Sequence, residues 1–128
     1  MDKSFDIFKS KQARQIIKYV EEKYNNKLEF LWIKFPKYAI FRHKENKKWY
    51  AILMSLEENK LGIESDKIID IVVLKNNRDN IINLIDNEKY FAGYHMNKRN
   101  WFTIKLDDSV PIKEIYYFID ESYLITNK

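Results

Sequence analysis

Two histidines, His43 and His95, are the only imidazole groups in the sequence, and there is no cysteine. A nucleophilic site needs a serine, cysteine or lysine beside a base that a third group orients, and neither histidine lies in such a motif. The two histidines are also far apart and have no ligand partner at the spacing of a helical metal site. Asp107-Asp108 and Glu57-Glu58 are adjacent carboxylates, and neighbours in sequence usually point apart. The sequence therefore predicts a protein that is not an enzyme and holds neither a metal nor a cofactor.

Two further kinds of site are disfavoured by composition. With only two glycines, the chain cannot form the glycine-rich cradle of a phosphate loop. An acidic ridge that binds iron would need several exposed carboxylates, but the first expected helix offers little beyond Glu21 and Glu22 among lysines.

Basic side chains gather in two short polar segments, each flanked by apolar stretches typical of strands. Basic residues exceed acidic ones by three over residues 42–48 and by two over residues 97–100, so the rest of the chain is slightly acidic beside the whole-chain charge of +4. Two cationic hairpin tips could hold a phosphate backbone, and DNA is therefore the expected partner. The candidate nucleic-acid-binding residues are Arg42, His43, Lys44, Lys47, Lys48, His95, Asn97, Lys98, Arg99 and Asn100.

Other interpretations of these segments stay open. Loop lysines also keep the edge of a sheet soluble, and the histidines near the tips are expected to be partly exposed polar side chains. Trp49, Tyr50, Tyr94 and Trp101 could stack on bases or, more commonly for strand residues, pack in the core. A module that binds a protein partner or forms a homodimer through its sheet is the alternative function.

Apolar periodicity defines the elements that would position these residues. The order α-β-β-β-α-β-β-α predicts an α+β fold in two layers, a mainly antiparallel five-stranded sheet with helices on one face. Without repeats or linkers, residues 1–128 are expected to form a single domain, with Ile17, Val20, Ile115 and Ile119 in its core. We expect helices over residues 10–25, 77–86 and 109–123, and strands over residues 38–43, 49–55, 68–75, 93–96 and 101–106.

The expected location is the cytoplasm. The absence of cysteine suits a reducing compartment, and the first six residues mix acid and base where an export signal would have a basic and then an apolar segment. The longest apolar run, residues 71–74, is far shorter than the roughly 20 residues of a membrane-spanning helix. We therefore expect no contact with a membrane.

Residues 93–101, Gly-Tyr-His-Met-Asn-Lys-Arg-Asn-Trp, resemble the signature region of the MmcQ/YjbR family. Further matches include Pro36-Lys37-Tyr38-Ala39, Phe41-Arg42-His43 and Lys48-Trp49-Tyr50-Ala51. The resemblance implies a fold like those of secretion chaperones and CyaY-like (frataxin-like) proteins, and DNA binding through a double wing at residues 42–48 and 95–99. This sequence departs from the family pattern at Asn76-Asn77, where Cys-Asp is common, and at Asn100, where a second histidine is common.

Overall fold

The computed structural model, which describes residues 4–128, contains one five-stranded antiparallel sheet in the order β1-β2-β3-β5-β4. The predicted α+β class and the predicted order of strands and longer helices are confirmed. The strands are β1 (Tyr38–Arg42), β2 (Trp49–Glu57), β3 (Ile68–Lys75), β4 (Tyr90–Ala92) and β5 (Trp101–Lys105). The helices are α1 (Ser4–Ile7), α2 (Lys11–Tyr24), the 3-10 helix η1 (Glu58–Leu61), α3 (Arg78–Leu84) and α4 (Ile112–Thr126).

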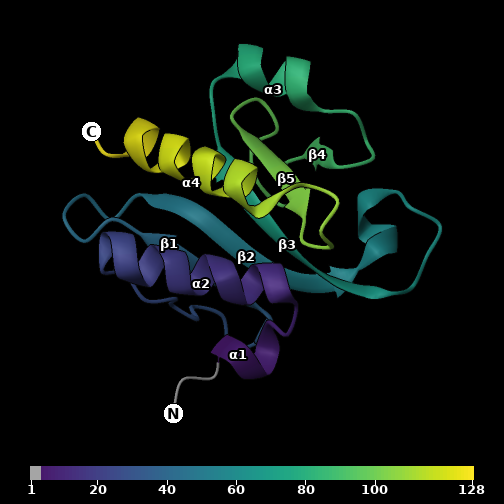
Figure 1. The fold of residues 1–128 in the computed structure, drawn as a ribbon, viewed down its shortest axis with the longest axis horizontal. Coiled ribbons are helices and arrows are strands. Elements are labelled where there is room, and N and C mark those ends of the chain that lie inside the picture. Colours follow the sequence, from purple (N-terminus) through teal and green to yellow (C-terminus); the bar gives the residue numbers. More distant parts are fainter. Residues whose placement is uncertain (1–3) are drawn as a thin grey trace.

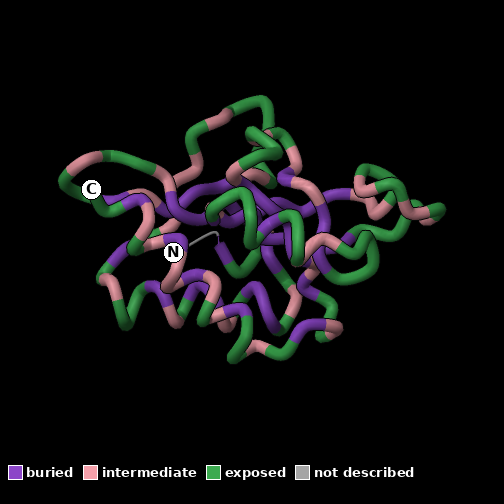
Figure 2. Tube along the Cα trace, turned by 90° about the horizontal axis from the view of Figure 1, so that it is seen from above, coloured by how far each residue is buried: buried purple, intermediate pink, exposed green. Residues whose placement is uncertain are grey.

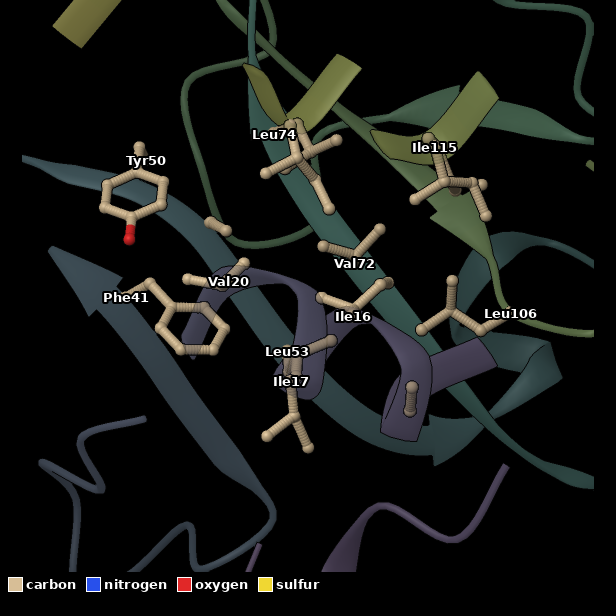
Figure 3. Close-up of a cluster of buried hydrophobic side chains, with 14 of the residues drawn as sticks. Ile16, Ile17, Val20, Phe41, Tyr50, Leu53, Val72, Leu74, Leu106 and Ile115 are labelled. Carbon is tan, nitrogen blue, oxygen red and sulfur yellow. The ribbon is translucent and has the colours of Figure 1, made fainter. Parts of the chain in front are cut away.

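Helices α2 and α4 lie on one face of the sheet (Figure 1). The Ser10 side chain accepts a hydrogen bond from the backbone N–H of Ala13 at 3.1 Å and so caps the start of α2. Asn25 adopts a left-handed conformation and ends that helix. Ile16 and Val20 of α2 meet Ile115 of α4 and the inner residues of β2 and β3 in a buried cluster (Figure 3). The predicted core residues Ile17, Val20, Ile115 and Ile119 are all buried.

The strand register places the β1–β2 and β4–β5 connections at the same end of the sheet. Ala51 pairs with Leu74, and Lys75 pairs with Trp101, so the start of β2, the end of β3 and the start of β5 lie together. Strand β3 separates the two hairpins. Both connections therefore project from the same end of the sheet, but they are not direct neighbours there.

Several boundaries differ from those predicted, and α4 begins and ends three residues later than expected. The fourth strand is β4 and not residues 93–96, because His95 adopts a left-handed conformation that no strand accommodates. Helix α3 ends at Leu84 because the Asp86 side chain accepts hydrogen bonds from the backbone N–H groups of Glu88, Lys89 and Tyr90 and starts a turn. These bonds lower the pKa of Asp86 to about 2.

The second face of the sheet is also apolar, and connecting segments, including the short helix η1, cover it in place of α2 and α4. Ile52 and Ile71 belong to a buried cluster on this face, against which Trp32, Leu61 and Met96 pack. Figure 2 shows the buried trace in the middle of the molecule and exposed trace along its outer connections. Within residues 4–128, no helix has the length and apolar character needed to cross a membrane.

Candidate nucleic-acid interface

The connection between β1 and β2, residues 43–48, is called the first connection. Its polar groups largely hold the end of α4: Asn46 Nδ2 donates to the Thr126 carbonyl at 2.9 Å, and Lys48 Nζ donates to the Lys128 carbonyl at 3.3 Å. Asn46 Oδ1 also accepts from the Lys48 backbone N–H at 2.8 Å. Lys44 and Lys47 stay exposed, with the acidic Glu45 between them in sequence.

Arg42, at the end of β1, is engaged in an ion pair. Its Nε and Nη2 atoms donate to the two carboxylate oxygens of Glu29 at 2.9 and 2.8 Å. This bidentate pair joins β1 to the segment that precedes it, where Glu29 forms an isolated bridge with Ile40. The Arg42 guanidinium is therefore a weaker candidate for a phosphate contact than its charge indicated.

His43 is only 4% exposed, contrary to the expectation of a partly exposed side chain. Its Nε2 atom lies 2.7 Å from Thr126 Oγ1, and its ring packs against Tyr50 and Tyr123 at centroid distances of 4.9 and 4.4 Å. Burial lowers the pKa of His43 below its ordinary value of 6.5, so the ring is neutral at pH 7. The sequence placed His43 beside the tip but could not indicate that the last turn of α4 covers it.

Residues 93–100, between β4 and β5, are called the second connection. Gly93 begins it at a close approach, since an added Cβ would lie 2.7 Å from Trp101 Cβ and 2.8 Å from the Trp101 carbonyl oxygen. Asn97 Oδ1 then accepts from the Arg99 backbone N–H at 2.8 Å and fixes a turn. His95, Asn97, Lys98 and Arg99 remain exposed.

The second connection lies beside α3, and the Asn76 backbone N–H donates to the Asn100 carbonyl at 2.9 Å (Figure 1). This bond brings Arg78 to Lys98 and Arg99 around a hollow of about 290 Å³, called the basic hollow. Its other described lining residues are Ile81, Ile82 and Ile85, and no carboxylate is among them. Sequence reasoning missed Arg78 because the β3–β5 pairing that places it here joins distant segments.

An aromatic groove of about 390 Å³ lies on the second face of the sheet. Trp32 stands nearly perpendicular to Trp49 and to Tyr38, with centroid distances of 5.5 and 6.5 Å. Phe35 stacks on Tyr38 at 5.3 Å. The groove is lined by Trp32, Phe35, Tyr38, Trp49, Ile52, Met54, His95 and Met96.

The four aromatic residues near the hairpin bases divide into two groups. Tyr50 and Trp101 are buried and serve the core. Trp49 and Tyr94 are half-buried on the second face, and Trp49 lines the groove. Burial first, and then the charge interaction and hydrogen bond with Tyr94, raise the pKa of Tyr38, so its hydroxyl is a neutral hydrogen-bonding group at pH 7. Core packing therefore accounts for half of this set.

A titratable cluster that sequence reasoning missed joins α2 to α4. Asp120 accepts hydrogen bonds from the hydroxyls of Tyr19 and Tyr24 and from Lys23, at 2.6 to 2.9 Å. Burial acts to raise the pKa of Asp120, but these bonds together lower it. The rings of Tyr24 and Tyr123 stack at 3.8 Å across the same interface. The cluster holds the two helices together.

In the described residues, no group of three or more His, Asp or Glu side chains could hold a metal ion.

Known proteins share both the sequence and the fold. The YyaQ protein of Bacillus subtilis (strain 168) is 40% identical over 111 residues, which cover 87% of this chain and 94% of that protein. The YjbR protein of Escherichia coli (strain K12) is 52% identical over 29 residues, 23% of this chain and 25% of that protein.

A crystal structure of a Pseudomonas syringae protein has a TM-score of 0.85 and 40% identity, and the match covers 88% of this chain and 97% of that one. A DUF419 domain protein from Deinococcus radiodurans, at 22% identity and a TM-score of 0.61, shares the fold over 80% of this chain and 69% of its own. The sequence model of the YjbR family matches residues 21–125, which include both connections and the groove. The chain therefore belongs to the YjbR family.

Proposed function

We propose that this chain binds nucleic acid without catalysing a reaction, and that the basic hollow and the second connection make the main phosphate contacts. The observation that supports the proposal is the convergence of Arg78, Lys98 and Arg99 around one hollow with no carboxylate among its described lining residues. Neighbouring phosphates repel one another, and three clustered cations relieve this repulsion while releasing condensed counterions. The expected location stays the cytoplasm, where nucleic acid is accessible.

The first connection has a secondary role in this proposal. Arg42 is paired with Glu29, and Lys48 contacts the end of α4. The exposed Lys44 and Lys47 attract a polyanion over a distance, and Glu45 between them reduces that attraction. The double wing thus becomes one docking wing and one wing that mainly supports the fold.

The experiment compares two triple variants with the unmodified protein, using fluorescence anisotropy of a labelled oligonucleotide from about 50 to 200 mM salt. Removal of the three hollow cations should flatten the slope of log affinity against log salt by roughly 2 to 3 units, since each phosphate contact contributes about 0.7 to 0.9. The matched removal of three charges from the first connection should change that slope by less than one unit. The variants are Arg78→Gln with Lys98→Gln and Arg99→Gln, and Lys44→Gln with Lys47→Gln and Lys48→Gln.

Equal flattening by both variants would show that net charge, and not the basic hollow, attracts the nucleic acid. Failure of the unmodified protein to bind any oligonucleotide at the lowest salt would refute the proposed function itself.

A protein-contact function is the second candidate, and one observation favours it. Leu31, Ile33 and Phe35 are exposed on the segment before β1, and Ile33 is 99% exposed. Exposed apolar side chains that gather in one place often mark a protein contact. Gel filtration with light scattering of the unmodified protein and of Ile33→Ser tests it, since a dimer that this change dissociates would favour the protein-contact function.

A further inference from the structure

The aromatic groove and the basic hollow each share a lining residue with a third hollow. His95 lines the groove and also a second hollow of about 340 Å³ that contains Lys60 and Lys98. Lys98 in turn lines the basic hollow with Arg78 and Arg99. Through His95 and Lys98, the second connection therefore borders all three hollows in series, one aromatic and two cationic.

We propose that this series is a track for single-stranded nucleic acid, in which an unpaired base enters the aromatic groove while the adjoining phosphates lie over Lys60, Lys98 and the basic hollow. The inference rests on the proposed function and names its substrate class. Bases within a duplex are stacked on one another, so their faces are closed to protein rings. Only an unpaired base can lie flat on an aromatic side chain.

The ring geometry of the groove suits a planar guest. Because Trp32 is nearly perpendicular to both Trp49 and Tyr38, a base that stacks on one ring meets a neighbouring ring edge-on. Offset stacked and edge-to-face contacts are the favoured arrangements of aromatic rings. His95 is exposed at the junction with the next hollow, where an imidazole can hydrogen-bond to a base edge or a phosphate.

Charge distinguishes this track from the opposite end of the sheet. The described residues that line the groove and its two adjoining hollows include no carboxylate. The large cleft at the other end, about 650 Å³, is lined by charges of both signs, with Asp6, Asp70, Asp107 and Asp108 beside Lys9, Lys11, Lys37 and Lys67. The track therefore has an excess of cations while the charges of the cleft balance. A polyanion is favoured along the track, which selects a nucleic acid strand over an uncharged apolar peptide as the occupant.

The test measures anisotropy of an oligothymidylate of about 12 residues, within the usual site size for one small domain, beside a duplex of equal charge. Trp49→Leu should weaken binding of the single strand by roughly 5- to 150-fold, the loss of one stacked base, with the salt slope unchanged. Duplex binding should not respond. Phe35→Ala, at a more exposed position, should act in the same direction and guards against a folding defect in Trp49→Leu.

The remaining outcomes separate this inference from the proposed function. If the basic-hollow variant flattens the salt slope while both aromatic variants bind the single strand normally, the track is wrong and nucleic-acid binding stands. Competition by micromolar adenosine monophosphate would identify a small nucleotide, and not a strand, as the occupant and would overturn the track. A dimer of the unmodified protein that either aromatic substitution dissociates would make the groove a protein contact, which also overturns it.

Discussion

The two connections at the basic end of the sheet carry similar charge but differ in what their side chains do. In the first connection, His43 is buried against α4 and Asn46 bonds to the end of that helix. In the second, His95 is exposed, Lys98 Nζ donates to the Gly93 carbonyl at 3.3 Å within the same connection, and Lys98 and Arg99 line hollows. A cationic loop is thus better suited to binding where its side chains are not tied to a distant element of the fold.

The two histidines offer the largest expected contrast. His43→Asn should lower the free energy of unfolding by roughly 2 to 4 kcal/mol, because it removes a buried ring from between Tyr50 and Tyr123 and alters the contact with Thr126. The same change at His95 should stay within about 0.5 kcal/mol, since that side chain is exposed and asparagine tolerates the left-handed backbone there. Urea denaturation of both variants measures the difference, and equal losses would contradict the account of the first connection.

Gly93 gives a smaller expected effect at the base of the second connection. Gly93→Ala should cost about 1 to 3 kcal/mol, because the new Cβ would overlap Trp101 and force the strands β4 and β5 apart. It should also weaken nucleic-acid binding by displacing Lys98. Gly62→Ala is the control: it meets no neighbouring atom, although its left-handed backbone adds strain, and it should leave binding unchanged. Unaltered stability and binding in Gly93→Ala would show that the second connection needs no close approach.

The pH dependence of stability should report the buried His43. Because the pKa of His43 is lower in the folded state, the unfolded chain binds the proton first as pH falls through about 6.5. The native state therefore loses stability as pH falls, by up to about 1.4 kcal/mol per pH unit, until the pH reaches the folded pKa. Denaturant unfolding between pH 7 and 5 should show this loss in the unmodified protein and in His95→Asn. His43→Asn should lack that component, and a loss that persists in it would assign the effect to other groups.

Much of the fold could be predicted because it depends on local patterns. The helical stripe through Ile17 and Val20 has one period and packs in one cluster. The apolar run of β3 is continuous because its side chains are buried on both faces of the sheet. The boundary of β4 could not be predicted in the same way, because residues 93–96 are apolar enough for a strand and only the close approach of Gly93 to Trp101 and the left-handed His95 end it.

The candidate site was predictable in charge but not in arrangement. Counting residues located Lys98 and Arg99, while Arg78 joins them through strand pairing between distant segments. Likewise the ion pair of Arg42 with Glu29 and the burial of His43 depend on long-range packing. The groove combines residues from the segment before β1, from β1 and β2 and from the second connection, a juxtaposition that no local spacing encodes.

The most direct test of the central claim is a titration of the nitrogen-15-labelled protein with oligothymidylate at low salt, followed by two-dimensional NMR. We predict that the largest amide shifts fall on residues 95–100 and on Arg78, with smaller shifts at residues 43–48. Shifts that are largest at residues 43–48, or equal at the two connections, would contradict the claim that the second connection is the docking surface.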